Sequence, residues 1–105
     1  MDVMTEVDGQ VVRLRGRLDV SGTAQARDAL HMALERGHGS LVVDLSAVEL
    51  MDASGLGVLV GAHRRAGRLD RSLILRDVPP RLARILLVTR LDRVLRIERG
   101  AVCAA

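Results

Sequence analysis

Residues 41–60 read LVVDLSAVELMDASGLGVLV and join an apolar strand to a helix through a polar turn that contains glycine. Leu41–Val43 is a continuous apolar run with Asp44 at its end, a pattern typical of a central strand covered on both faces. From Ser54 onward, apolar residues recur at three- and four-residue spacing, which predicts a helix. Ligands of open α/β sheets gather at the carboxyl ends of strands, so the turn Met51–Gly57 is the candidate functional site.

The rest of the chain divides into short elements with clear boundaries. Asp8-Gly9 predicts a type I′ hairpin turn, Ser21 or Thr23 is available to cap the first helix, and Gly37 to end it. A hairpin followed by three helix–strand alternations predicts an α/β fold with helices packed against a mostly parallel sheet. The predicted strands are Met4–Val7, Val11–Leu18, Leu41–Val43, Leu73–Leu75 and Val94–Ile97, and the predicted helices are Thr23–Arg36, Ser54–Arg68 and one opened by Pro79-Pro80.

Composition limits both the size and the chemistry of the protein. A chain of 105 residues with 49% hydrophobic content predicts a single domain, with a core at about residues 3–99 and a short C-terminal tail at 100–105. Aromatic residues and lysines are absent, which excludes aromatic stacking platforms and lysine-based catalysis. A lone Cys103 cannot form an internal disulfide. No apolar stretch approaches the ~18 residues of a membrane span, so we expect a cytoplasmic protein without membrane insertion.

Charge is distributed unevenly along the chain. Residues 1–62 carry five arginines against nine acidic residues, whereas residues 63–105 carry eleven against four. A basic surface of this kind suits nucleic acid or an acidic protein face. Arginines on solvated helix faces explain the excess equally well, and we expect no direct binding to nucleic acid.

Sequence motifs for enzymatic chemistry are missing. The chain contains no GxxxxGK[ST], GxGxxG or HExxH motif. His31, His38 and His63 are too widely spaced to form a metal site. The GxSxG motif of the hydrolase nucleophile elbow is also absent, because Asp52 and Leu56 stand around Ser54 where the motif has glycines. We therefore expect no catalytic residue, no metal and no cofactor.

Ser54 and the glycines that follow it have a structural and a functional interpretation. As a plain helix N-cap, Ser54 would lose ~1 kcal/mol on replacement by alanine. Gly55 and Gly57 cost up to ~1 kcal/mol each in a helical turn relative to alanine, so stability alone does not favour them. They leave backbone exposed and allow another surface to approach closely.

The stretch 41–60, together with VVRLRGRLD before it and ILRDVPPRLARILLVTRLDRVLRI after it, resembles a STAS domain of the anti-sigma factor antagonist type. The specific core of the resemblance is Asp-x-Ser-Gly-Leu-Gly, here Asp52 to Gly57. The segment from Gly16 to Asp19 and the terminal Leu91-Asp92 support it. The resemblance covers nearly the whole chain.

This resemblance implies a phosphorylation switch at Ser54. The unphosphorylated protein would bind an anti-sigma factor that is also a serine kinase, which frees the sigma factor, and a PP2C-type phosphatase would reset the switch. Asp52 corresponds to the acidic residue beside the phosphorylated serine, and Asp19 to the acid that ends the Gly-x-Leu-Asp segment. The implied partner-binding residues are Asp19, Asp52, Ala53, Ser54, Gly55, Leu56 and Gly57.

The chain departs from the family pattern at two positions. Arg17 stands where many members carry an acidic residue, and this charge reversal favours a change in partner selectivity. Ala53 replaces a hydroxyl residue and so removes a competing phosphoacceptor. Asp19 is interpreted equally well as a turn acid with local backbone bonds. The alternative function is a STAS subunit that docks on a membrane transporter, such as a phospholipid-transport ABC complex, without phosphorylation.

Overall fold

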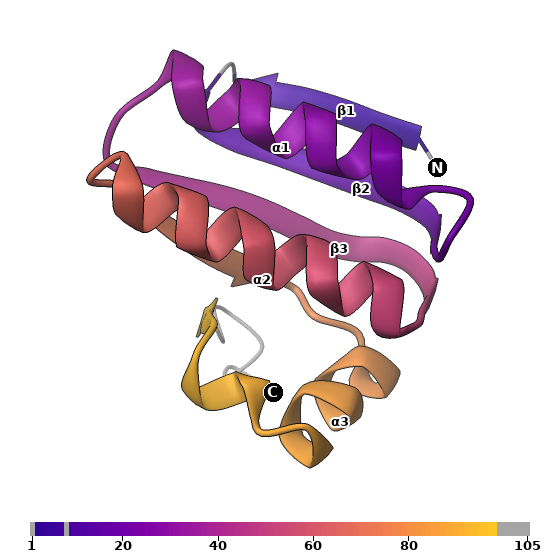
Figure 1. Cartoon of the computed structure of the whole chain (residues 1–105). Coiled ribbons are helices and arrows are strands. Elements are labelled where there is room, and N and C mark those ends of the chain that lie inside the picture. Colours follow the sequence, from indigo (N-terminus) through magenta and orange to yellow (C-terminus); the bar gives the residue numbers. More distant parts are fainter. Residues whose placement is uncertain (1, 8, 99–105) are drawn as a thin grey trace.

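Figure 1 shows the computed structural model of the chain, which describes residues 2–7 and 9–98. Within these ranges the elements follow the predicted order, a hairpin and then three alternations of helix and strand. The strands are β1 (Asp2–Val7), β2 (Val11–Leu18), β3 (Ser40–Met51), β4 (Ser72–Arg76) and β5 (Arg96–Glu98), and the helices are α1 (Thr23–Arg36), α2 (Ala53–Arg68), α3 (Pro80–Val88) and the short 3-10 helix η1 (Leu91–Arg93).

The five strands form one sheet in the order β1-β2-β3-β4-β5. Strand β1 pairs antiparallel with β2, and all other neighbouring strands are parallel. Right-handed crossovers that each add a strand at the same edge place their helices on one face of the sheet. Figure 1 shows α1 and α2 side by side on that face. Both helices therefore begin at what we call the carboxyl end of the sheet, where β2 and β3 finish.

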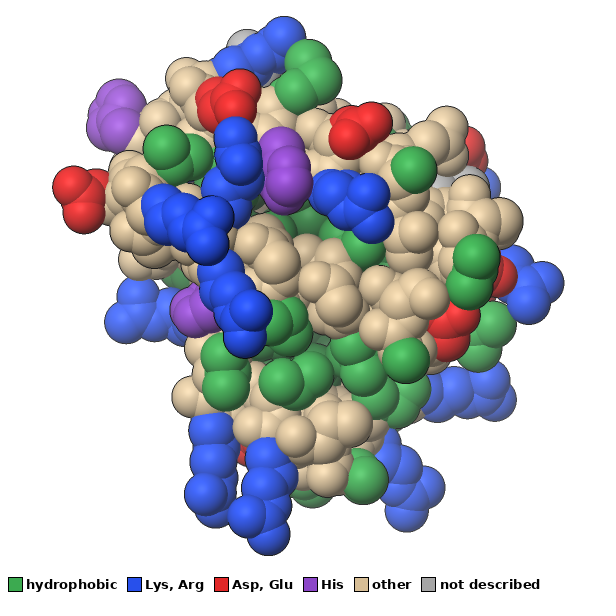
Figure 2. All heavy atoms as spheres, viewed as in Figure 1, with side chains coloured by type: hydrophobic (Ala, Val, Ile, Leu, Met, Phe, Trp, Pro, Cys, Tyr) green, Lys and Arg blue, Asp and Glu red, His purple; other side chains and the backbone are tan. Residues whose placement is uncertain are grey.

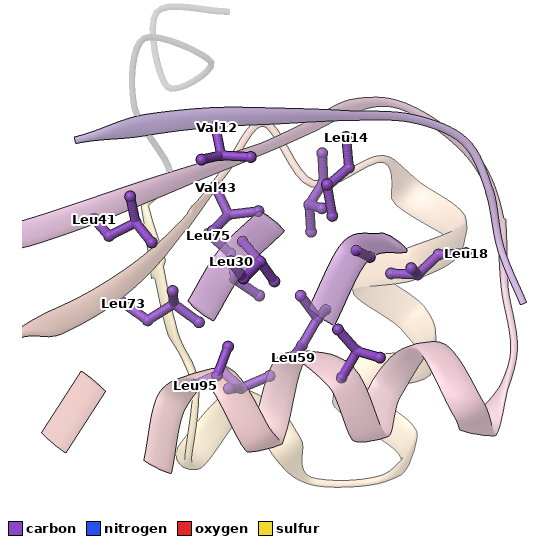
Figure 3. Packing of buried hydrophobic residues seen from close by; sticks show 14 of the residues in the cluster. Val12, Leu14, Leu18, Leu30, Leu41, Val43, Leu59, Leu73, Leu75 and Leu95 are labelled. Atoms are coloured by element: carbon purple, nitrogen blue, oxygen red, sulfur yellow. The ribbon is translucent and has the colours of Figure 1, made fainter. Parts of the chain in front are cut away.

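The core lies between the sheet and the helices and consists of aliphatic side chains. Val12, Leu14 and Leu18 of β2 are fully buried, while the arginines between them are at least partly exposed, as their alternation predicts. Leu30 of α1 and Leu59 of α2 are also fully buried and meet the leucines of the sheet (Figure 3). This packing fixes the positions of both helices relative to the carboxyl end of the sheet.

Asp44 of β3 lies in register with Arg13 of β2 and Arg76 of β4. Its Oδ2 accepts hydrogen bonds from Arg13 at 3.3 Å and Arg76 at 3.2 Å, and its Oδ1 accepts one from the Ser46 amide at 2.8 Å. Burial alone raises the pKa of Asp44, but the hydrogen bonds of Ser46 and Arg76 and the charge of Arg13 outweigh it and hold the pKa below its usual value. Two arginines thus cover a carboxylate that is only 2% exposed.

Strand β3 is longer than the sequence predicts. The apolar run Leu41–Val43 forms only its beginning, and the strand continues to Met51 because residues 47–51 pair with residues 15–18 of β2. Asp44 therefore lies inside the strand and not at its end. The continuation depends on pairing with a distant segment, which no local apolar pattern records.

Two further boundaries differ from the prediction. The last strand was expected at Val94–Ile97, but β5 begins two residues later because η1 precedes it. The expected cap of α1 by Ser21 or Thr23 is wrong, since Gly22 occupies the N-cap position without a side-chain hydrogen bond. The Ser21 hydroxyl donates instead to Asp19 Oδ1 at 2.7 Å.

Some expectations fall on residues outside the described ranges. These are the type of the Asp8-Gly9 turn, the environment of Cys103 and the tail at 100–105. In residues 2–7 and 9–98, no helix combines the length and the apolar character that a membrane span requires.

Candidate functional site

The turn between β3 and α2 is organised by Asp52. This residue is the N-cap of α2, and its Oδ1 accepts a hydrogen bond from the Gly55 amide at 3.0 Å. Its backbone carbonyl accepts from the Leu56 amide at 3.0 Å and begins the helical ladder. The interpretation of Ser54 as the N-cap is therefore wrong, because an aspartate two residues earlier takes that position.

Ser54 is the second residue of α2 and is partly exposed. Its hydroxyl makes no hydrogen bond with the part of the chain that the structure describes, and Asp52 does not hold it. The amides of Ala53 and Ser54 lie in the first helical turn, where no carbonyl four residues back is available within the helix. An unengaged hydroxyl thus lies beside the positive end of the α2 dipole.

Gly55 is required by the packing of the domain itself. It is buried, and a Cβ built at this position would collide with the carbonyl oxygen of Leu18 and approach the Met51 side chain at 2.8 Å. Gly57 differs, because it is exposed and a Cβ there would meet nothing within 4 Å. The expectation that both glycines open the backbone to a partner is therefore corrected for Gly55, whose close neighbour is β2.

We expect Gly55→Ala to destabilise the domain by about 1–3 kcal/mol, because the added methyl group meets backbone that cannot move aside cheaply. Gly57→Ala is the matched control and should stabilise α2 by up to ~1 kcal/mol. Urea unfolding followed by far-UV circular dichroism measures both changes. A Gly55→Ala protein as stable as the wild type would contradict the assignment of Gly55 to packing.

The Asp19 turn lies next to the Ser54 turn at the carboxyl end of the sheet. Leu18, the last residue of β2, pairs with Met51, the last residue of β3, so the residues that follow them emerge side by side. The Asp52 amide donates to the Leu18 carbonyl at 3.4 Å and links the two turns. The structure thus brings Asp19 and the segment from Asp52 to Gly57 to one end of the molecule.

Asp19 makes the local bonds of a turn acid. Its Oδ1 accepts from the Ser21 amide at 3.1 Å as well as from the Ser21 hydroxyl, and its backbone carbonyl accepts from the Gly22 amide at 2.9 Å. The hydrogen bond from the Ser21 hydroxyl is the largest of the effects that lower its pKa. Arg17 lies 3.4 Å from Asp19 Oδ2, so this departure from the family pattern places a counter-charge on the acid.

Sequence reasoning missed one exposed apolar residue at this end. Val20, between Asp19 and Ser21, is 74% exposed. Ala53 is also exposed, whereas Leu56 is partly buried and packs against the core. The sequence signal that could have found Val20 is its position inside a polar turn, where no alternation of apolar and polar strand residues requires a valine. This end of the molecule thus combines three groups. They are the Ser54 hydroxyl, which has no hydrogen bond within the described residues, the Asp19 carboxylate and the exposed Val20 side chain.

The described residues contain no group of three histidine, cysteine, aspartate or glutamate side chains that could hold a metal ion. The carboxyl end of the sheet presents the Ser54 hydroxyl beside the N-terminus of α2, next to the turn that carries the exposed Val20. The molecule is thus a small α/β domain with a partly exposed serine in the first turn of α2.

Comparison with known proteins places the chain in a family. The family described as "Mlab, STAS domain" matches residues 1–97, so the chain belongs to the STAS domain family. The anti-sigma-B factor antagonist of Staphylococcus epidermidis is 27% identical over 100 residues, which are 95% of this chain and 93% of that protein.

Solved structures share the fold. An anti-sigma factor antagonist from Mycobacterium paratuberculosis superimposes with a TM-score of 0.82 at 24% identity. The superposition covers 98% of this chain and 89% of the Mycobacterium chain. The Bacillus cell-fate determinant SpoIIAA in its phosphorylated form has a TM-score of 0.69 at 19% identity, with 98% of this chain and 95% of its own covered.

Proposed function

We propose that this protein is an anti-sigma factor antagonist whose binding state is set by phosphorylation of Ser54. In its unphosphorylated form it binds an anti-sigma factor with serine kinase activity in the cytoplasm and frees the sigma factor. A PP2C-type phosphatase restores that form. The protein acts as one domain with a core at about residues 3–99, and it is the substrate of the kinase and not itself an enzyme.

The observation that carries this proposal is the state of the Ser54 hydroxyl. It is partly exposed, it makes no hydrogen bond within the described ranges, and it follows directly on a turn fixed by Asp52. A kinase can reach such a hydroxyl without unfolding the helix. The names of the relatives support the same function, since the curated Staphylococcus protein is called an anti-sigma-B factor antagonist.

Phosphorylation is compatible with the fold. In the transfer, the Ser54 oxygen forms a bond to the γ-phosphorus of ATP, ADP leaves, and the hydroxyl proton passes to a base on the kinase. The new group carries roughly −1.5 to −2 charges at a helix N-terminus, where free amides and the dipole stabilise an anion. The first-turn amides of Ala53 and Ser54 are donors of this kind. The modified domain therefore stays folded.

The docked complex does not tolerate the same group. A partner that covers Ser54 and the neighbouring Val20 must desolvate whatever occupies the hydroxyl position, and Val20 is 74% exposed in the free chain. Burying an unpaired phosphate costs several kcal/mol, and each ~1.4 kcal/mol lowers affinity tenfold. Phosphorylation thus changes binding strongly while it changes the fold little.

Intact mass with site mapping tests the proposal. The wild type and Ser54→Ala are incubated with a lysate of the host bacterium and ATP. We expect one added phosphate on the wild type, mapped to Ser54, and none on the variant. Ser40→Ala is the matched control, since Ser40 is an exposed serine at the opposite end of β3 and its loss should leave the added mass unchanged.

Absence of phosphate from the wild type, in a lysate whose kinases modify an added control substrate, would contradict the proposal. The protein would then be examined as the transporter-docking subunit, by testing whether it copurifies with a membrane ATPase. A phosphate that persists in Ser54→Ala would instead place the switch at another residue.

A further inference from the structure

The helical face of the domain carries a groove between α1 and α2. Its volume is about 170 Å³, and it is lined by Arg27, His31, Gly57, Val58, Gly61, Arg65 and Arg68. Figure 2 shows basic side chains gathered over these two helices. We call this feature the interhelix groove. Its lining has three arginines, one histidine and no acidic residue.

The charges in the interhelix groove are only partly compensated. Arg65 pairs with Glu35 at 2.7 Å, and both side chains are exposed by more than a third. Arg27 and Arg68 make no hydrogen bond or ion pair with the described part of the chain. Burial lowers the pKa of His31, and the charges of Arg65 and Arg27 lower it further, whereas Asp28 and Glu35 oppose them. Two of the three arginines that line the groove thus have no ion-pair partner among the described residues.

Glycines form the floor of the interhelix groove. Gly57 and Gly61 are four residues apart and therefore lie on the same strip of α2. Both are exposed, and a Cβ at either would meet nothing within 4 Å. Each costs ~0.8–1 kcal/mol relative to alanine inside a helix, and no contact with the described residues requires it. The backbone of α2 is consequently bare between flanking arginines, which is what close contact with another chain needs.

The interhelix groove is continuous with the proposed switch. Gly57 follows Ser54 by three residues, which is about one helical turn or ~5 Å along the helix axis. A segment seated in the groove would reach the Ser54 hydroxyl at its end. Arg65 and Arg68 follow Ser54 by 11 and 14 residues, or about 17 and 21 Å along the helix axis, which is beyond the ~8–10 Å over which salt screens charges.

We propose that the interhelix groove docks an acidic helical segment of the anti-sigma factor kinase, with small side chains packed on Gly57 and Gly61 and carboxylates paired with Arg65 and Arg68. This inference rests on the proposed function and names the surface and the chemistry of its partner. Gly57 and Gly61 lie four residues apart on α2 with open space above them, so the backbone of a second helix can approach α2 closely there, which favours a helix as the occupant.

Binding of the kinase that phosphorylates Ser54 in the lysate, purified and measured by isothermal titration calorimetry, tests this proposal. Gly61→Gln fills the floor with a better helix former, so we expect higher thermal stability together with affinity lower by at least about tenfold. Arg68→Glu should weaken binding by at least about tenfold, and the loss should shrink as salt is raised.

Two matched variants control the experiment. Gly67→Ala removes a glycine from the same helix outside the groove, where a Cβ also meets nothing within 4 Å. Arg84→Glu reverses the charge of an exposed arginine on α3. Both should bind the kinase within about twofold of the wild type, because surface changes away from a contact have small effects.

The outcomes separate the groove from the switch. If Gly61→Gln and Arg68→Glu bind like the wild type while Ser54→Asp does not, the switch stands and the groove proposal is overturned. If the wild type binds no such kinase, both proposals fall. If Arg68→Glu instead abolishes binding of a fluorescent DNA duplex that the wild type binds, the groove serves nucleic acid and the proposal is again overturned.

Discussion

Ser54→Asp weakens binding to the anti-sigma factor kinase by at least about 100-fold, because an unpaired carboxylate buried in the interface costs several kcal/mol. The variant remains folded, since an acid in the first turn of a helix is favourable. Isothermal titration calorimetry at fixed salt measures the loss, and far-UV circular dichroism verifies the fold. The expected result is thus a binding defect in a protein of unchanged stability.

Two further variants serve as controls for this prediction. Ser54→Ala keeps the site neutral and should bind as the wild type does while it resists phosphorylation. Ser40→Asp places the same charge on an exposed serine at the opposite end of β3 and should also bind normally. If Ser54→Asp bound within about threefold of the wild type, a charge at this position would be compatible with the interface and the switch would be refuted.

Arg71→Met destabilises the domain by about 3–5 kcal/mol, because a buried charged hydrogen-bond donor is lost and its acceptors stay buried. Arg71 is 6% exposed. Its Nη1 donates to the carbonyls of Ala33 at 2.8 Å and Leu34 at 3.0 Å in the last turn of α1. Its Nη2 donates to Gly9 at 2.5 Å and its Nε to Gly39 at 3.1 Å. One guanidinium therefore joins α1, the hairpin turn and the start of β3.

The chain has no aromatic residue, so urea unfolding is followed by far-UV circular dichroism. Arg84→Met, on an exposed position of α3, is the control and should change stability by less than about 0.5 kcal/mol. Arg71→Lys keeps the charge but lacks the planar fork of donors, and it should fall between the two. An Arg71→Met protein within about 1 kcal/mol of the wild type would show that water replaces these bonds without cost.

Much of the candidate site was predictable from the sequence. The turn from Met51 to Gly57 is marked by a polar break between an apolar strand and an amphipathic helix, which is a local pattern. The roles within the turn were less accessible. Asp52 and Ser54 are both good capping residues, and only the backbone geometry shows that Asp52 is the N-cap and that the Ser54 hydroxyl is unengaged.

Gly55 illustrates the same limit. A glycine after a serine suggests an open backbone, yet Gly55 faces the carbonyl of Leu18 from a strand that ends far earlier in the sequence. Gly57 looks alike in the sequence and has open space around it. The packing of the domain therefore requires the first of these two neighbouring glycines, whereas no contact with the described residues requires the second.

The sequence by itself determined the order of the elements, the apolar face of each and the position of the turn between β3 and α2, because periodicity and turn chemistry act over a few residues. Tertiary structure alone decided that Arg71 joins Gly9 across 62 positions and that Asp44 is covered by arginines 31 and 32 positions away. It also set the full length of β3 and the groove between α1 and α2. These features depend on contacts between segments far apart in the chain, and a local pattern carries no record of which distant segment will lie beside it.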